Sequence, residues 1–168
     1  ASTSSNAISI TGTTAKAGGY VAGIIALRSG NYLIQSTATT GGGIQFVGNN
    51  TTTSGTQMIF TGAGGTGYIL SKNGPIEFSG TGGTAGFQSS GAIKLGSHSA
   101  VTVNGVTSSI LSSASNITLT TDYFAFGASS AINTTGSLTI QPYGTSFSSI
   151  QTLSNLSFAS SLSQVTLG

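Results

Sequence analysis

The chain lacks cysteine and has almost no charge. Its 168 residues include 4 of Lys or Arg, 2 of Asp or Glu and 1 His, so that only 4% are charged, against about 25% in typical globular proteins. The absence of cysteine excludes disulfides and thiolate metal sites. Disorder requires low hydrophobicity together with high net charge, whereas 37% of this chain is hydrophobic and its net charge is +2. We therefore expect an ordered fold.

Neither nucleic-acid binding nor membrane insertion is expected. Lys16, Arg28, Lys72 and Lys94 are scattered with no basic run, and neutralising about 6 to 10 phosphates needs more positive charge than these side chains supply. Apolar residues never run for 18 positions, which excludes a transmembrane helix. No charged-then-apolar signal opens the sequence, so we expect any export signal to lie outside it.

The titratable side chains are too few for catalysis or metal binding. Glycoside hydrolysis needs two carboxylates that face one cleft, and nothing in the sequence brings the two acids, Glu77 and Asp122, together. The single histidine, His98, lies between two serines and is expected to be a solvated turn residue. Structural and catalytic zinc sites use three or four protein ligands. We therefore expect no enzyme, no cofactor and no metal.

Short apolar triplets recur along the chain. In each, two large residues flank a small or polar one, so two side chains point inward and one outward. Turn-forming Gly, Ser, Thr and Asn lie between them. Many such minimal strands at a recurring interval indicate a repeat architecture. The triplets are Ile8-Ser9-Ile10, Ile44-Gln45-Phe46, Ile76-Glu77-Phe78, Ile93-Lys94-Leu95, Val101-Thr102-Val103, Ile117-Thr118-Leu119, Phe124-Ala125-Phe126, Leu138-Thr139-Ile140, Leu156-Ser157-Phe158 and Val165-Thr166-Leu167.

The spacing of the triplets predicts an all-β fold, a right-handed parallel β-helix (β-solenoid) of roughly eight coils. Each coil would pair with the next at about 4.8 Å. Residues 1–168 would form one segment, irregular over 1–75 and regular over 76–168. The 32 positions between Ile44 and Ile76 are expected to be one coil with an extra excursion. The predicted faces hold, first, Ile8, Ile24, Ile44, Ile76, Ile93, Ile117, Leu138 and Leu156; second, Phe87, Val101, Phe124, Phe147 and Val165; third, Ile110, Ile132 and Ile150.

An antiparallel β-sandwich is the alternative fold. A sandwich favours longer strands joined by two-residue hairpin loops. Only Asn104-Gly105 offers a clean turn pair of that kind. The sequence therefore favours the β-helix over the sandwich.

The repeats of the carboxy-terminal third resemble a known family. The segments are 115–120 (SNITLT), 136–142 (GSLTIQP) and 162–168 (LSQVTLG). They resemble repeats of bacterial secreted proteins of the filamentous-haemagglutinin type and of autotransporter passengers. The resemblance implies a long right-handed β-helix, exported as an adhesive or structural stalk. It carries over no catalytic, cofactor or metal residues.

The expected function is that of a non-catalytic structural segment of an extracellular bacterial fibre, stalk or adhesin. Stacked strands make a stiff rod whose length grows with repeat number. Neither end carries an amphipathic helix or a charged, Pro-bearing strand as a cap, so we expect strand pairing to continue across at least one end, with adjoining repeats or another copy of the chain. Glycans of host or neighbouring cells are further expected partners. A chain that crosses membranes unfolded gains from having no cysteine, which agrees with a location outside the cell or on its surface.

Outward threonines offer a second hypothesis for function. Thr102, Thr118, Thr139 and Thr166 are the outward members of their triplets. Stacked on one face, they would form a surface ladder that binds ice or carbohydrate. A thermal-hysteresis measurement separates ice binding from a purely structural role.

Two contacts between side chains are also expected. Glu77 and Lys94 are outward members of triplets 17 positions apart, so they are predicted to form a cross-strand ion pair worth at most ~1 kcal/mol. Phe124 and Phe126 flank Ala125 and are predicted to point inward together.

Five asparagines begin Asn-x-Ser/Thr patterns. Such patterns accept N-linked glycans, but asparagine at a coil corner also tolerates left-handed backbone and can stack its amide on the next coil. The sequence favours the structural role and leaves glycosylation open. The five are Asn49, Asn50, Asn116, Asn133 and Asn155.

Overall fold

The computed structural model shows a protein built from β-strands. It describes residues 6–14, 22–27, 30–50, 56–61, 65–80, 84–89, 91–104, 108–127, 129–149, 157–158 and 160–168, and this part of the chain contains no helix. The strands are β1 (Asn6–Thr14), β2 (Ala22–Leu27), β3 (Tyr32–Ser36), β4 (Gly43–Asn50), β5 (Thr56–Thr61), β6 (Thr66–Ser71), β7 (Ile76–Gly80), β8 (Thr84–Ser89), β9 (Ala92–Asn104), β10 (Ser108–Ser113), β11 (Ile117–Phe126), β12 (Ser130–Thr134), β13 (Ser137–Gln141), β14 (Ser157–Phe158) and β15 (Gln164–Leu167).

The strands form two sheets, in which every described pairing is parallel. One sheet follows the order β1-β4-β7-β9-β11-β13-β15, with β3 and β6 attached through β9, and the other follows β14-β12-β10-β8-β5-β2. Parallel neighbours need crossover connections, whereas a sandwich of hairpins is antiparallel. The antiparallel alternative is therefore wrong.

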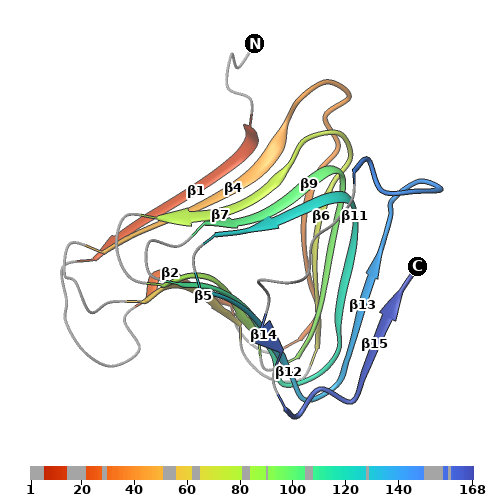
Figure 1. Ribbon diagram of the computed structural model, residues 1–168. Coiled ribbons are helices and arrows are strands. Elements are labelled where there is room, and N and C mark those ends of the chain that lie inside the picture. The colour runs from red at the N-terminus through yellow and green to blue at the C-terminus, as the bar shows by residue number, and fades with distance from the viewer. Residues whose placement is uncertain are drawn as a thin grey trace.

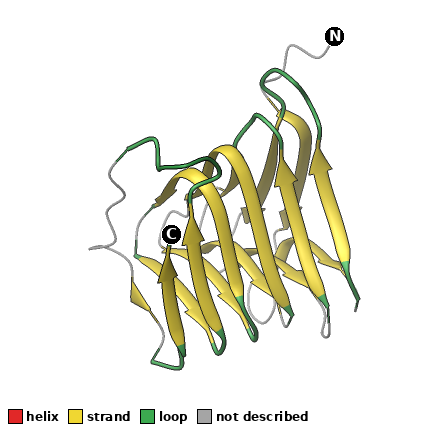
Figure 2. Cartoon of the chain, turned by 90° about the vertical axis from the view of Figure 1, so that its right-hand side faces the viewer, coloured by secondary structure: helices red, strands yellow, loops and turns green. Residues whose placement is uncertain are grey.

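The strands lie on three sides, which Figure 1 shows along the direction of stacking. The long strands β9 and β11 turn a corner, so the first half of β9 pairs with β6 and its second half with β7. We call β3, β6, the first halves of β9 and β11, β13 and β15 the first side. The second side is β1, β4, β7 and the second halves of β9 and β11, and the third side is the six-stranded sheet. Figure 2 shows strands of the first side next to one another.

Each side buries in-register columns of large apolar side chains. Phe46 and Phe78, one above the other on the second side, stack with ring centroids 5.1 Å apart and planes 8° apart. Burial of a large apolar side chain stabilises a fold by about 1.5 to 3 kcal/mol. Three such columns are Ile69, Leu95, Leu119 and Ile140 on the first side, Ile44, Ile76, Val101 and Phe124 on the second, and Phe87, Leu111 and Ile132 on the third.

The predicted sorting of residues into faces is partly wrong. Ile8, Ile44 and Ile76 share one column as predicted, but that column continues into Val101 on the second side and not into Ile93. Ile93 instead lies on the first side with Ile117 and Leu138. The reason is that the 17 positions from Ile76 to Ile93 lead from the second side through the third to the first. This is less than one full circuit of the three sides.

Four further assignments also differ from the prediction. Phe87 and Ile24 belong to the third side, where they occupy one column with Leu111. Val165 lies on the first side, opposite Leu138. On β10 the buried residue is Leu111, whereas Ile110 is half-buried. Ile132 lies on the third side as predicted, and Ile150 and Leu156 lie outside the described residues.

The separation between paired positions varies along the chain. Asn31 and Thr66 are joined over 35 positions, Gln45 and Glu77 over 32, and Asn116 and Ser137 over 21. Ile44 and Ile76 are direct neighbours, as the expectation of one long coil requires. The described strands pass six times through the third side, where the sequence predicts roughly eight coils for the whole chain.

Two corners are built from buried hydroxyl groups. Between the third and first sides, Ser89, Ser113 and Thr134 occupy one column, each at most 5% exposed. Between the first and second sides, the Ser97 hydroxyl donates to the Gly74 carbonyl at 2.9 Å and accepts from the Ser99 amide at 3.0 Å. These bonds satisfy backbone groups that the turns leave unpaired inside the fold.

Candidate functional site

The three residues that could serve acid–base chemistry have structural partners. Glu77 is half-buried on the second side, and its Oε2 accepts from Gln45 Nε2 at 3.2 Å. Asp122 lies at the corner of β11 and its Oδ1 accepts from the amide of Tyr143 at 2.8 Å. His98 is exposed on β9, at a corner of the stack, with its ring centroid 3.6 Å from that of Tyr143. His98 was expected in a solvated turn; it is exposed, but within a strand.

The predicted ion pair between Glu77 and Lys94 is wrong. In the register of the sheet, Glu77 lies between Gln45 and Thr102 on the second side. Lys94 is on the first side, where its Nζ lies 5.4 Å from the centroid of the Tyr68 ring. The ammonium therefore has a cation–π partner in place of a carboxylate. The error follows from placing Ile76 and Ile93 on one face.

The structure aligns three of the four predicted ladder threonines. Thr118, Thr139 and Thr166 are consecutive neighbours on the first side. Thr102 lies instead on the second side, opposite Ala125. The column on the first side thus presents three threonines on strands about 4.8 Å apart. Lys94 is the next member of this column, beside Thr118.

One of the five candidate glycosylation asparagines has a clear structural role. The Asn116 side-chain oxygen accepts from the Ser137 amide at 2.9 Å, across to the next strand of the first side. Asn31, outside the Asn-x-Ser/Thr set, makes the same kind of bond to the Thr66 amide at 2.8 Å. Both bonds agree with the predicted corner role of asparagine. Asn155 and the side chain of Asn50 lie outside the described residues.

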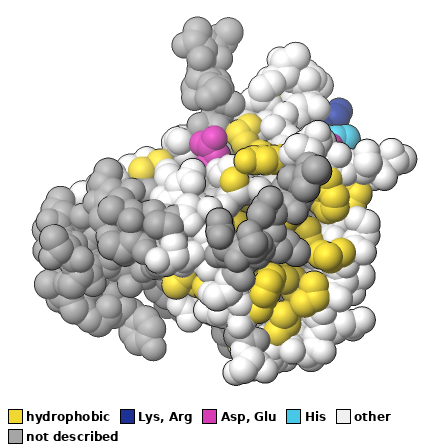
Figure 3. Space-filling model, viewed as in Figure 1, with side chains coloured by type: hydrophobic (Ala, Val, Ile, Leu, Met, Phe, Trp, Pro, Cys, Tyr) yellow, Lys and Arg dark blue, Asp and Glu magenta, His cyan; other side chains and the backbone are white. Residues whose placement is uncertain are grey.

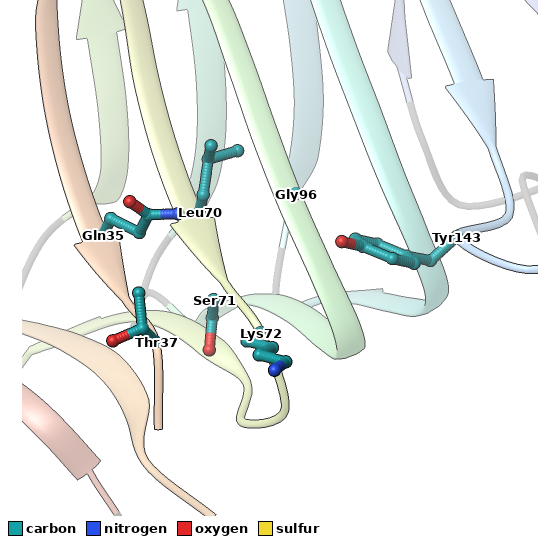
Figure 4. Close-up of a pocket in the computed structure, with 7 residues that line it drawn as sticks. All are labelled: Gln35, Thr37, Leu70, Ser71, Lys72, Gly96 and Tyr143. Atoms are coloured by element: carbon teal, nitrogen blue, oxygen red, sulfur yellow. The ribbon is translucent and has the colours of Figure 1, made fainter. Parts of the chain in front are cut away.

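A pocket on the outer surface of the first side was not predicted from the sequence. It has a volume of 270 Å³ and spans the ends of β3 and β6 and the middle of β9. Gly96 and Leu70 are register neighbours within it, and Tyr143 extends toward β9 from the loop after β13 (Figure 4). The remaining lining residues are Gln35, Thr37, Ser71 and Lys72. The pocket could not be predicted from the sequence because Lys72 and Tyr143, far apart in the chain, line it together only once the strands stack. An aromatic residue in a loop with Gly and Ser was its one local signal.

The described residues hold no cluster of three or more His, Cys, Asp or Glu side chains that could bind a metal ion. Within the same residues, no helix is long and apolar enough to cross a membrane. Compared with protein-family models, with curated proteins and with solved structures, the chain matches none.

Proposed function

We propose that the chain is a non-catalytic structural segment of an extracellular bacterial fibre, stalk or adhesin. In this proposal the three sides are those of a right-handed parallel β-helix. The right hand is the one that connections between parallel strands of a sheet adopt in about 98% of cases. The segment would act as a rod that lengthens as further coils stack on it.

The observation that carries the proposal is the uncovered core at β15. Val165 and Leu167 lie in register with Leu138 and Ile140, which are 0% and 1% exposed. Yet Val165 is 44% and Leu167 60% exposed. Figure 3, which looks onto this end of the stack, shows hydrophobic side chains uncovered there. A further parallel strand paired with β15 would bury Val165 and Leu167, as β15 buries Leu138 and Ile140.

Among the described strands, β15 is the last of its sheet and has a partner on one edge only, which supports the same proposal. An edge strand presents a row of unpaired N–H and C=O groups that can template another strand. A copy of this chain, or an adjoining repeat of the same polypeptide, would add in the same direction, giving an open head-to-tail assembly. The described part of β15 carries no charged residue, so we expect stacking to persist at high salt.

Electron microscopy and sedimentation of the purified chain test the proposal. We expect filaments of constant width whose length grows with protein concentration. Leu167→Lys would place a charge at the stacking surface and stop growth. Thr166→Lys, on the same strand but pointing outward, is the matched control and should leave growth intact. Monomers at all concentrations, with β15 amides as protected from hydrogen exchange as those of β11, would contradict the proposal.

The threonine column favours a second candidate function, ice binding. Thr118, Thr139 and Thr166 repeat at the strand spacing on the first side, and such an array of hydroxyl and methyl groups could order water. We expect Thr139→Tyr, in the middle of the column, to abolish thermal hysteresis. Thr102→Tyr, on the second side, should preserve it. The absence of hysteresis from the unmodified chain would exclude this function.

A further inference from the structure

We propose that the pocket on the first side binds an acidic monosaccharide of the uronic acid type. This site is separate from the stacking surface at β15 and does not depend on fibre assembly. Its volume of 270 Å³ is slightly below the roughly 300 Å³ at which pockets for drug-sized ligands begin. A pocket of this size suits one sugar ring better than a longer chain.

The floor of the pocket includes Gly96 and Leu70. Gly96 takes an outward position on β9, beside Leu70 on β6 and Thr120 on β11. Because Gly96 has no side chain, the Leu70 side chain can lie against it: an added Cβ would be 3.0 Å from Leu70 Cδ2, and Gly96 is buried. The half-buried Leu70 side chain, lying over Gly96, offers an apolar surface for the C–H face of a sugar ring.

Tyr143 forms a preorganised aromatic wall. Its amide and that of Gly144 donate to Asp122 Oδ1 at 2.8 and 3.2 Å, which fixes the start of the loop. The ring of Tyr143 rests on the ring of His98, with 3.6 Å between centroids. Figure 4 shows the Tyr143 hydroxyl directed toward Gly96. A wall held both by its backbone and by its ring loses little entropy when a ligand binds.

The polar residues of the pocket select an anion that also carries hydroxyl groups. Lys72 contributes an exposed ammonium group, and the described lining contains no carboxylate to neutralise it. Gln35 and Thr37 lie on the side of the pocket away from Tyr143 (Figure 4) and supply an amide and a hydroxyl group. A uronic acid matches this set, because its carboxylate faces Lys72 while its hydroxyls bond to Gln35 and Thr37.

A pair of isosteric probes tests the proposal with the full 168-residue chain. Methyl β-D-glucuronide and methyl β-D-glucoside differ only in the carboxylate, and each is titrated by NMR. We expect the glucuronide to bind at least five-fold more tightly. Lys72→Ala should remove this preference, whereas Lys94→Ala, whose ammonium lies over Tyr68 outside the pocket, should keep it.

A second pair of variants tests the aromatic wall. Tyr143→Ala should weaken both sugars at least five-fold, and Tyr123→Ala, a similarly exposed tyrosine outside the pocket, should weaken neither. Unchanged amide spectra away from the substitution show that each variant is folded. The proposal fails if neither sugar binds, if both bind equally, or if Lys94→Ala acts like Lys72→Ala. Equal competition by inorganic phosphate would reduce the pocket to an unspecific anion site and overturn the sugar assignment.

Discussion

The Ser113 hydroxyl donates to the Gly91 carbonyl at 2.7 Å and so joins two corners that are 22 positions apart. The same oxygen accepts from the Ser115 amide at 2.9 Å. One level further, the Thr134 hydroxyl donates to the Ser115 carbonyl and accepts from the Gly136 amide. A series of hydrogen bonds therefore runs from strand to strand at this corner of the stack. Among the described residues, seven serines and two threonines are buried, so a part of the Ser and Thr content is buried structure.

Replacing Ser113 by Ala should destabilise the fold by about 1 to 3 kcal/mol, because a buried carbonyl and a partly buried amide lose their partner. Chemical denaturation measures the change. Ser112→Ala, on the same strand but pointing outward, should change stability by no more than about 0.5 kcal/mol. Equal effects at the two positions would mean that the hydrogen bonds of Ser113 contribute nothing net.

Phe124 and Phe126 should differ in their contribution to stability. Phe124 is 6% exposed and its ring lies 6.3 Å from that of the half-buried Phe126. Both were predicted to point inward. We expect Phe124→Ala to cost about 3 to 5 kcal/mol, and Phe126→Ala to cost less, since part of its surface is already in water. A larger loss at Phe126 in thermal or urea unfolding would contradict the burial of this pair.

Gly86 is required for the pairing of β8 with β10. Its φ is +154°, and an added Cβ would lie 1.8 Å from the Ile110 carbonyl oxygen on the paired strand. Gly86→Ala should therefore cost at least about 1 to 3 kcal/mol from backbone strain, with further loss from the clash. Gly144→Ala is the control, because nothing lies within 4 Å of its added Cβ. Faster hydrogen exchange of β8 and β10 in the first variant alone would verify the prediction.

The strands themselves could be predicted because alternation is a local property. Ile117 and Leu119 are buried with Thr118 between them half-buried, as a period of two requires. Alternation fails where two large residues adjoin: nothing local distinguishes Ile110 from Leu111. Only the pairing of β10 with β8, which sets Leu111 opposite Phe87, makes Leu111 the buried residue.

The assignment of strands to sides could not be predicted, because the number of residues between paired positions on neighbouring strands is not constant. The loops decide which triplets meet, and their lengths leave no periodic signal. The same uncertainty affects every contact between strands that are distant in the sequence. It also affects the pocket, which Tyr143 lines together with residues of β3 and β6. The prediction of an ion pair between Glu77 and Lys94 was wrong for the same reason.

A double-mutant cycle between Glu77 and Gln45 tests the register of the second side directly. Their side chains are 3.2 Å apart on neighbouring strands, so Glu77→Ala and Gln45→Ala should be coupled by about 0.5 to 1 kcal/mol. Glu77→Ala and Lys94→Ala act on different sides and should add within about 0.3 to 0.5 kcal/mol. The coupling to Gln45 should persist in high salt better than an exposed ion pair would, since Gln45 carries no charge to screen. If coupling appeared with Lys94 and not with Gln45, Ile76 would pair with Ile93, and the columns described for the first and second sides would be displaced.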